Sequence, residues 1–258
     1  MITQRRFGFE IEAYNAPSSQ VREKLEANGV SGYKVKRDAS IRGDNPFEMV
    51  SKIHRGQLGL DTARKAIETL RDLGALTNGS CGFHVHIDMT SASLDDFKRV
   101  FKRFIKFEPI FRKLVDTSRL SNVYCKSLST RFGSKAEAFQ KIKDAKTLEE
   151  LAYVVNGGLG IQNRYMALNI QSFWRHGTIE FRLKESTLDP EEVVNWISML
   201  LIWVEDSLAI NTRLGKDNPK EESLIEMMVA PRNHNQLAEP ERRKTHSYLK
   251  AKVKGSIA

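Results

Sequence analysis

The chain has 258 residues, of which 40% are hydrophobic and 28% charged, so it can bury a sizeable core and is not expected to be disordered as a whole. No apolar run approaches the roughly 20 residues of a membrane-spanning helix, and no apolar segment follows the basic residues near the N-terminus, which favours a cytoplasmic protein without a membrane partner. The net charge of +9 fits either a solvated basic surface or a polyanionic partner such as nucleic acid or a nucleotide substrate.

The first part of the chain combines short strand patterns with two helical patterns. Alternating apolar and polar residues predict three strands, at 7–14, 32–36 and 47–52. Periodicity close to that of a helix predicts two helices, at 18–27 and 58–73. Ser19 is a candidate cap for the first helix, and Gly74 closes the second.

A second group of patterns begins at residue 82. A strand is predicted at 82–89, and Ser93 caps a long amphipathic helix that extends to about residue 115. Pro109 inside this helix predicts a kink or a break, because proline cannot donate a backbone hydrogen bond. Residues 119–160 fit a helical insertion or arm.

The last part of the chain predicts a hairpin followed by helices. Two strand patterns, at 165–173 and 178–184, are joined through Arg-His-Gly at 175–177. Asp189-Pro190 then provides favourable entry chemistry for a helix to about residue 211. A further helix at 221–228 is predicted before the C-terminal residues.

The separation of strands by helices predicts an α+β fold, in which helices cover one face of a mostly antiparallel sheet. We expect one catalytic domain over residues 1–238, with 119–160 as its insertion or arm, followed by a basic C-terminal tail over 239–258. The sequence contains neither a Walker loop nor a Rossmann glycine motif.

Three predicted strands carry apolar side chains on one face and charged or imidazole side chains on the other. The polar faces comprise Glu10 and Glu12; His84, His86 and Asp88; and Glu180, Arg182 and Lys184. For one such strand alone, the simplest interpretation is a half-exposed strand whose polar residues face water. Three such strands in one sheet bring carboxylates together, and these repel each other unless a cation lies between them. Carboxylates with a minority of imidazole suit Mg²⁺ or Mn²⁺, and the two histidines leave zinc as an alternative.

Further polar residues are candidates to join this face. Arg182 suits an anionic oxygen or a phosphoryl group, and a charge-balancing salt bridge is the alternative. Arg164 precedes the predicted hairpin, and Asn169 is a polar residue on a strand whose neighbours face the core.

Two short segments supply additional carboxylates. Asp38 and Ser40 lie in an Asp-Ala-Ser segment, for which plain turn chemistry is the alternative interpretation. Glu48 lies on a short strand between two apolar residues, a pattern that alone indicates little.

Six segments, in their order along the chain, resemble the family of putative amidoligases, a branch of the glutamine synthetase and glutamate–cysteine ligase superfamily. The segments are FGFEIEAY (7–14), DAS (38–40), FEMVSKI (47–53), CGFHVHIDM (81–89), RYMALNI (164–170) and GTIEFRL (177–183). The resemblance implies a glutamine-synthetase-like antiparallel sheet whose concave face binds ATP and a divalent metal, Mg²⁺ or Mn²⁺. The second segment departs from the expected Asp-Gly-Ser, and Lys52 stands where the family commonly has proline.

The same resemblance implies roles for individual residues. Metal ligands would be Glu10, Glu12, Glu48, Glu180 and one of the two histidines, with His84 as the first candidate. Contacts to nucleotide or acyl phosphate would come from His84, His86, Arg182 and Arg164. The second-tier candidates for catalysis are Asp38, Ser40 and Asn169.

The implied activity is ATP-dependent joining of a carboxylate to an amine. ATP would convert the carboxylate into an acyl phosphate, which the amine attacks, with Asp38 as a candidate base. Three alternatives are a metal-dependent hydrolase that uses the same cluster to activate water, a binding protein that keeps the fold but has lost catalysis, and a nucleic-acid-associated protein that uses the basic surface. The intact set of Glu, His and Arg residues argues against the second. No motif identifies the acid, the amine or the oligomeric state.

Overall fold

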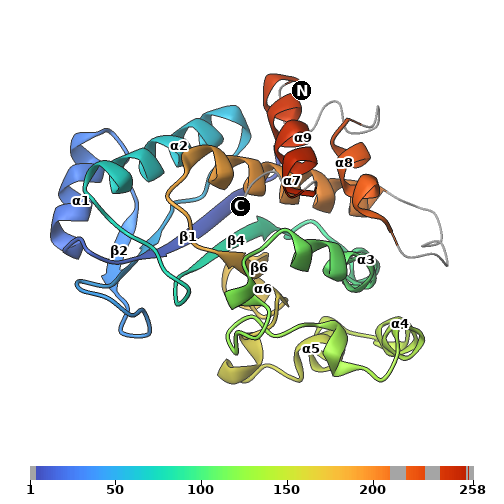
Figure 1. The fold of residues 1–258 in the computed structure, drawn as a ribbon. Helices are drawn as coiled ribbons and strands as arrows, with labels where there is room; N and C mark the ends of the chain where they lie inside the picture. The colour runs from blue at the N-terminus through green and yellow to red at the C-terminus, as the bar shows by residue number, and fades with distance from the viewer. Residues whose placement is uncertain (1–3, 210–218, 230–238, 254, 256–258) are drawn as a thin grey trace.

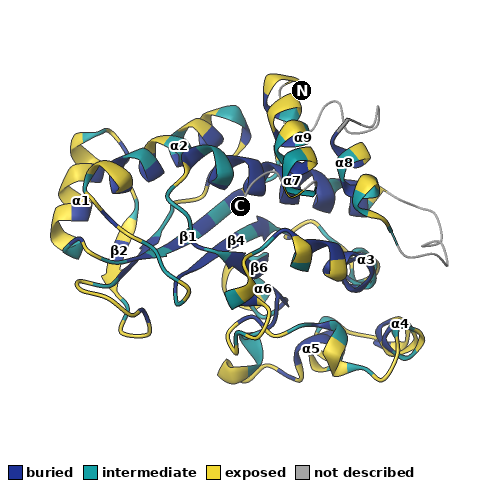
Figure 2. Cartoon of the chain, viewed as in Figure 1, coloured by how far each residue is buried: buried dark blue, intermediate teal, exposed yellow. Residues whose placement is uncertain are grey.

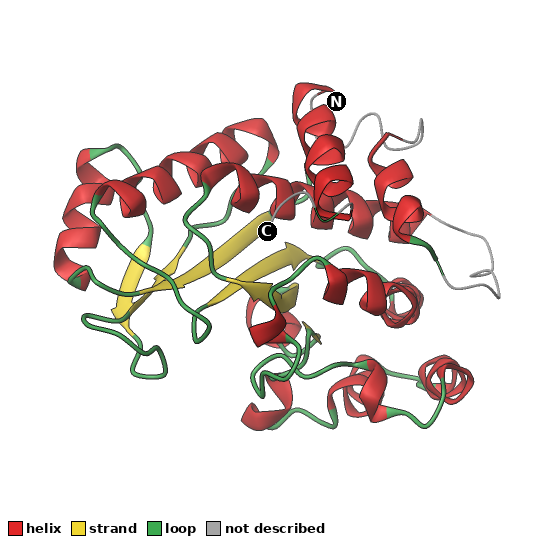
Figure 3. Cartoon of the chain, viewed as in Figure 1, coloured by secondary structure: helices red, strands yellow, loops and turns green. Residues whose placement is uncertain are grey.

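The computed structural model describes residues 4–209, 219–229, 239–253 and 255. Within these residues, six strands form one sheet in the order β2-β3-β1-β4-β6-β5, and all neighbouring strands are antiparallel (Figure 3). The strands are β1 (Phe7–Ala13), β2 (Lys34–Arg37), β3 (Phe47–Val50), β4 (Gly82–Asp88), β5 (Leu168–Asn169) and β6 (Thr178–Glu185). The predicted α+β class with an antiparallel sheet is therefore confirmed.

Most of the helices lie on one face of the sheet, and the others lie beyond its β6 side. They are α1 (Ser18–Ala27), α2 (Gly56–Asp72), α3 (Leu94–Lys113), α4 (Lys135–Asp144), α5 (Leu148–Asn156), α6 (Ser172–His176), α7 (Pro190–Ala209), α8 (Glu221–Val229) and α9 (Glu239–Val253). Short 3₁₀ turns are η1 (Thr117–Arg119), η2 (Ser129–Arg131) and η3 (Ile161–Arg164). Figure 1 shows α1, α2 and α7 on one side of the sheet, with α4 and α5 apart from them near α3.

The core lies between the apolar face of the sheet and this helical layer (Figure 2). Alternation places Phe9 of β1 and Phe83 of β4 on the covered face, where both are fully buried. Helix α7 is apolar around most of its circumference, which is typical of a central helix, and its Trp196 and Trp203 are also fully buried.

Helix α3 begins as predicted and passes through its proline. Ser93 forms a complete capping box with Asp96 at the start of the helix. The break at Pro109 is not found, because the apolar stripe continues past it: the Phe104 and Phe111 rings stack 5.6 Å apart. At α1 the predicted Ser19 cap is wrong, since the helix begins at Ser18 and no side chain caps it.

The predicted hairpin pairs as expected but has a different connection. Only Leu168 and Asn169 form β5, opposite Phe181 and Glu180 of β6. The chain then turns into α6 in place of the Arg-His-Gly turn, and Gly177 ends this helix with a φ of 68°.

The segment expected to be a basic tail contains helix α9, which packs on α7. Thr245 of α9 is fully buried and donates to Asn195 Oδ1 at 3.1 Å. Lys252 Nζ lies 3.0 Å from the carboxylate of Glu192 at the start of α7. The described residues of this segment therefore belong to the helical layer. For α7, the predicted end near residue 211 lies outside the described residues.

A β-bulge interrupts the register between β4 and β6. Val85 lies opposite Phe181, whereas Phe83 lies opposite Lys184, so β6 has one residue more than β4 across this interval. Because side chains alternate along a strand, one extra residue sends every following side chain to the other face.

The bulge corrects the prediction that Lys184 shares a face with Glu180 and Arg182. The Lys184 side chain lies on the helix-covered face, where it is completely buried. Its Nζ is 2.8 Å from Glu192 Oε1 and lies over the Trp196 ring at 5.6 Å. Of these three residues of β6, Glu180 and Arg182 are the two that face the open side of the sheet.

Candidate active site

The sheet register brings the polar faces of separate strands into one surface. The paired residues are Glu10 with His84, Glu12 with Glu48, His86 with Glu180, and Glu180 with Asn169. Asp88 does not take part: it lies at the end of β4, where it forms an ion pair with Arg6 at 2.8 Å.

This surface lines a cavity of about 1190 Å³. The predicted site residues that line it are Glu10, Glu12, Asp38, Ser40, Glu48, His84, His86, Arg164, Asn169, Glu180 and Arg182. The rim also carries large apolar side chains, including Val123 and Ile161, which are 59% and 68% exposed. The cavity exceeds the about 300–1,000 Å³ of a typical small-molecule pocket, so it has room for more than one ligand.

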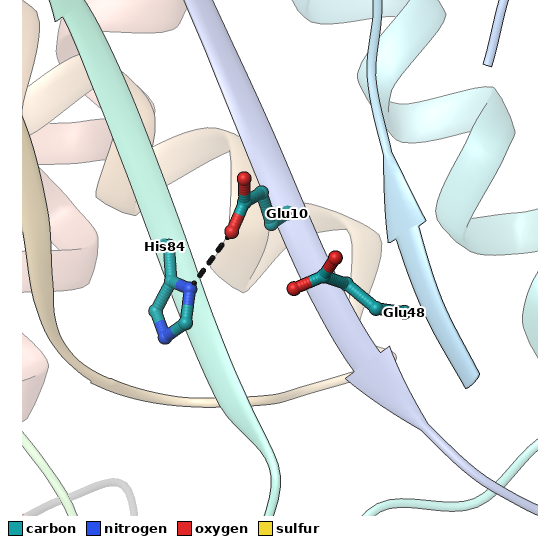
Figure 4. A group of neighbouring side chains, drawn as sticks. All are labelled: Glu10, Glu48 and His84. Atoms are coloured by element: carbon teal, nitrogen blue, oxygen red, sulfur yellow. Dashed lines mark hydrogen bonds and ion pairs between the residues drawn. The ribbon is translucent and has the colours of Figure 1, made fainter. Parts of the chain in front are cut away.

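Glu10 is the central carboxylate of the cluster. Its Oε2 is hydrogen-bonded to His84 Nδ1 at 3.0 Å, as Figure 4 shows. Its Oε1 lies 3.4 Å from His86 Nε2, which in turn lies 3.9 Å from Glu180 Oε1. The other ring nitrogen of His84 faces Glu12 Oε1 at 3.9 Å. The two histidines are therefore interleaved with carboxylates from β1 and β6.

A glycine next to this cluster makes its packing geometry clear. The backbone N–H of Gly82 donates to Glu12 Oε2 at 2.6 Å. A Cβ at this position would lie 2.8 Å from His84 Nε2, which is closer than any ordinary contact. The absence of a side chain at Gly82 thus leaves room for the imidazole and the carboxylate together.

Among the residues that the structure describes, three trios of side chains present ligand atoms that lie within 4.8 Å of one another. The trios are Glu10, Glu48 and His84; Glu10, His86 and Glu180; and Glu12, Asp38 and Glu48. Figure 4 shows the first trio. Because Glu10 and Glu48 each belong to two trios, the arrangement is suited to more than one cation side by side.

The carboxylates of this cluster differ in their ionisation. Burial would raise the pKa of Glu10, but the hydrogen bond with His84 and the charge of His84 and His86 outweigh it and hold the pKa well below its usual range. Burial and the negative charge of Glu10 raise the pKa of Glu48, and the ion pair with Lys36 only partly offsets this. The protein's own side chains therefore leave negative charge at Glu48 incompletely compensated, which favours a bound cation.

The donor set fits a hard divalent ion. His86 Nε2 is buried and has no hydrogen bond among the described residues, although it faces Glu10 and Glu180. Its Nδ1 lies 3.1 Å from Thr178 Oγ1; when this nitrogen carries the proton, the Nε2 lone pair is directed at the carboxylates. Each trio is mostly or wholly carboxylate, a composition that suits Mg²⁺ or Mn²⁺ better than zinc.

Arg182 both faces the cavity and forms the salt bridge considered as its alternative role. Its guanidinium is paired with Glu180 Oε1, and its Nε donates to the carbonyl of Tyr124 at 3.2 Å. Asn169 Nδ2 donates to the other oxygen of Glu180 at 2.8 Å. Burial would raise the pKa of Glu180, but the charge of Arg182 outweighs it and lowers the pKa. Glu180 is therefore ionised and fixed in direction.

The remaining predicted residues line the cavity from outside the sheet, with Arg164 at the end of η3 and the other two in a turn. Arg164 stacks over the Tyr165 ring at 5.2 Å, and its Nε has no hydrogen-bond partner among the described residues. Ser40 donates through both its backbone N–H and its hydroxyl to Asp38 Oδ1, at 2.9 and 2.7 Å. The turn chemistry at Asp38 is therefore present, and the same carboxylate belongs to one of the trios.

Some residues of the site were not predicted. Lys36, whose Nζ lies 2.6 Å from Glu48 Oε2, could have been recognised because Lys34 and Lys36 alternate with a buried valine. His176, whose ring centroid lies 5.9 Å from that of His86, and Arg119 reach the cavity only through tertiary packing, so no local pattern identifies them.

One comparison with known proteins identifies a family. Residues 3–204 match the model of a family described as "Putative amidoligase enzyme", whereas no curated protein matches the chain. A solved structure described as a novel glutamine synthase homolog shares 13% identity, with 99% of this chain and 68% of that chain covered and a TM-score of 0.44. Plasmodium falciparum glutamine synthetase shares 10% identity, with 98% and 73% covered and the same TM-score. None of the helices in the described parts of the chain has the length and apolarity to cross a membrane.

Proposed function

The chain belongs to the putative amidoligase family, and from this premise we propose that it is an ATP-dependent ligase that joins a carboxylate to an amine. The observation that carries the proposal is the overlap of three carboxylate-rich trios on one wall of the cavity, with Arg182 beside them. This combination of divalent-cation ligands and an arginine matches what phosphoryl transfer requires.

The proposed metal ligands are Glu10, Glu12, Glu48, His84 and Glu180, with His86 as a further donor. Bound Mg²⁺ or Mn²⁺ would neutralise the charge of the ATP phosphates while the γ-phosphoryl group moves. Neighbouring groups already orient two of these carboxylates. Asn169 and Arg182 hold Glu180, and the backbone N–H of Gly82 holds Glu12.

In the first proposed step, an oxygen of the substrate carboxylate attacks the γ-phosphorus of ATP, and ADP leaves with the bridging oxygen. Arg182 and Arg164 would donate to the transferring phosphoryl group. Arg164 is suited to this role because it has no carboxylate partner among the described residues, and its guanidinium is held by the ring of Tyr165.

In the second step, the amine nitrogen attacks the acyl carbon of the acyl phosphate, and inorganic phosphate leaves. The nitrogen must lose a proton, and Asp38 is the proposed acceptor. Ser40 holds Asp38 through Oδ1, which leaves Oδ2 as the atom that takes the proton.

Calorimetric titration with ATP tests the proposal directly. Wild type should bind ATP in the presence of Mg²⁺ or Mn²⁺ but not in EDTA, and Glu10→Ala should lose this metal-dependent binding. Asp88→Asn is the matched control, because Asp88 lies on the same strand as the histidines but outside the cavity. A screen of acid and amine pairs for ADP release follows. Absence of ATP binding under every condition would refute the proposed ligase activity. Metal-dependent hydrolysis of a substrate without ATP would indicate the metal-dependent hydrolase.

A further inference from the structure

Arg119 is a buried arginine that reaches the β-bulge of β6. It ends η1, and only 2% of its surface is exposed. Its Nη2 donates to the carbonyl oxygen of Arg182 at 2.9 Å, and its Nε donates to the carbonyl oxygen of Leu183 at 3.3 Å. These two carbonyls belong to the bulge, because Arg182 and Leu183 lie between Phe181 and Lys184, where the pairing of β6 with β4 changes register.

A bulge removes backbone groups from the regular ladder, so their carbonyls need other partners. A buried carbonyl without a partner is destabilising, whereas the planar guanidinium offers several donors in a fixed geometry. Arg119 is itself anchored, because its N–H donates to Asp116 O at 3.0 Å and its carbonyl accepts from Cys125 Sγ at 3.4 Å. The guanidinium is therefore a fixed support for the bulge.

The bulge decides which cation faces the cavity. If the register of the β4–β6 pair continued unbroken from His86 and Glu180, Lys184 would lie opposite Gly82 on the cavity face. Arg119 also occupies that space, since a Cβ on Gly82 would lie 3.2 Å from its Nη2. The same side chain thus supports the bulge and fills the position that Lys184 would otherwise enter.

We infer that Arg119 is a positioning residue for Arg182. By holding the bulge, it directs the Arg182 guanidinium into the cavity and keeps Lys184 against Glu192 on the helix-covered face. The effect of Arg182 on ATP turnover rests on the proposed function, whereas the effect of Arg119 on the position of Lys184 does not.

The first test measures the position of Lys184 without any ligand. Folded wild type, Arg119→Met and Arg119→Lys are treated with an amine-acetylating reagent, and acetylation of Lys184 is followed by mass spectrometry. Arg112→Met is the control, because Arg112 also donates to a carbonyl of the same segment, that of Leu120, at 2.6 Å. We expect acetylation of Lys184 to become at least about tenfold faster in Arg119→Met, because the buried side chain gains access to solvent. Arg119→Lys should show an intermediate rate, and Arg112→Met the wild-type rate.

An unchanged rate in Arg119→Met would overturn the inference, as would an equal increase in Arg112→Met. If Arg119→Met does not fold, Arg119→Lys decides by the same comparison with Arg112→Met.

The second test measures coupling to Arg182 through kcat/KM for ATP, in the presence of Mg²⁺ and of the acid and amine pair that the screen for ADP release identifies. Arg119→Met and Arg182→Met should each lower kcat/KM by about 100-fold, the size of effect that misplacement of a catalytic group can have. The double variant should be no worse than Arg182→Met alone, because both changes remove the same positioned guanidinium. Multiplied losses in the double variant would overturn the inference. Wild type that neither binds nor turns over ATP would refute the proposed function, and the acetylation rates would then decide the inference alone.

Discussion

Replacing Glu48 by glutamine should stabilise the metal-free protein while it weakens metal binding. Glu48 is buried on β3, its pKa is raised by burial and by the charge of Glu10, and it belongs to two of the three trios. Glutamine keeps the shape of the side chain and removes the charge. The two effects therefore have opposite signs in the absence and presence of metal.

The size of the stabilisation follows from the charges around Glu48. At 4.8 Å, the upper limit for ligand atoms in the trio, Glu10 and Glu48 repel by about 3.5 kcal/mol with an effective dielectric constant of about 20. The opposing Lys36 side chain is 65% exposed, so solvent screening limits its ion pair to about 1 kcal/mol or less. The attraction of His84 offsets a further part. We expect a net gain of about 1–2 kcal/mol for Glu48→Gln, or a rise in Tm of about 2–8 °C.

Thermal unfolding in EDTA and in excess MnCl₂ measures both signs. Glu48→Gln should melt above wild type in EDTA and below it in Mn²⁺, because wild type alone gains the full stabilisation from binding. Glu23→Gln, a change at an exposed position on α1, should follow wild type in both conditions. A lower Tm for Glu48→Gln than for wild type in EDTA would show that the negative charge of Glu48 does not destabilise the metal-free protein.

The stability difference between Glu48→Gln and wild type in EDTA should depend on pH in a defined direction. A carboxyl group whose folded pKa is raised above its unfolded value contributes stability that is present below the unfolded pKa and lost as the pH rises through the folded pKa. The advantage of Glu48→Gln over wild type in EDTA should therefore shrink as the pH falls towards 4.5, the ordinary value for glutamate.

Three other changes have definite expected results. Lys184→Met should reduce the unfolding free energy in urea by at most about 3 kcal/mol, because Glu192 loses its fully buried partner and keeps only Lys252, while Mn²⁺ affinity stays unchanged. Gly82→Ala should weaken Mn²⁺ binding at least about tenfold by displacing His84, with Gly160→Ala as a silent control. Burial would raise the pKa of Glu192, but the charge of Lys184 outweighs burial and lowers this pKa to about 2. Glu192 therefore contributes stability above pH 4.5 that is lost as the pH falls towards 2. Glu192→Gln should flatten the pH dependence of urea unfolding across that interval, and an unchanged slope would contradict the assignment.

The residues of the site could be predicted largely because strand alternation is a local property. Glu10 and Glu12 are separated by one apolar residue, as are His84 and His86, so each pair had to face the same side of its strand. The capping box at Ser93 is equally local and was found where the sequence predicts it. Such features depend on neighbours within a few residues, and tertiary packing did not change them.

Other features depended on contacts between distant segments. The short β5 and helix α6 replaced a longer hairpin strand, because Asn169 turns its side chain to Glu180 and to the N–H of Gln171. The helix formed by residues 239–253 is stabilised by contacts with Asn195 and Glu192 on α7, which no pattern within that segment reveals.

The α+β class and the membership of the carboxylate and histidine face follow from local patterns, because a period of two along each strand specifies which residues point together. Strand pairing, in contrast, is what moves Lys184 off that face while Arg182 stays on it. A single extra residue in β6 reverses the alternation, and the carbonyls that it frees are satisfied by Arg119, which lies more than sixty residues away along the chain. Strand periodicity is a short-range constraint, whereas a register is defined only between two paired strands.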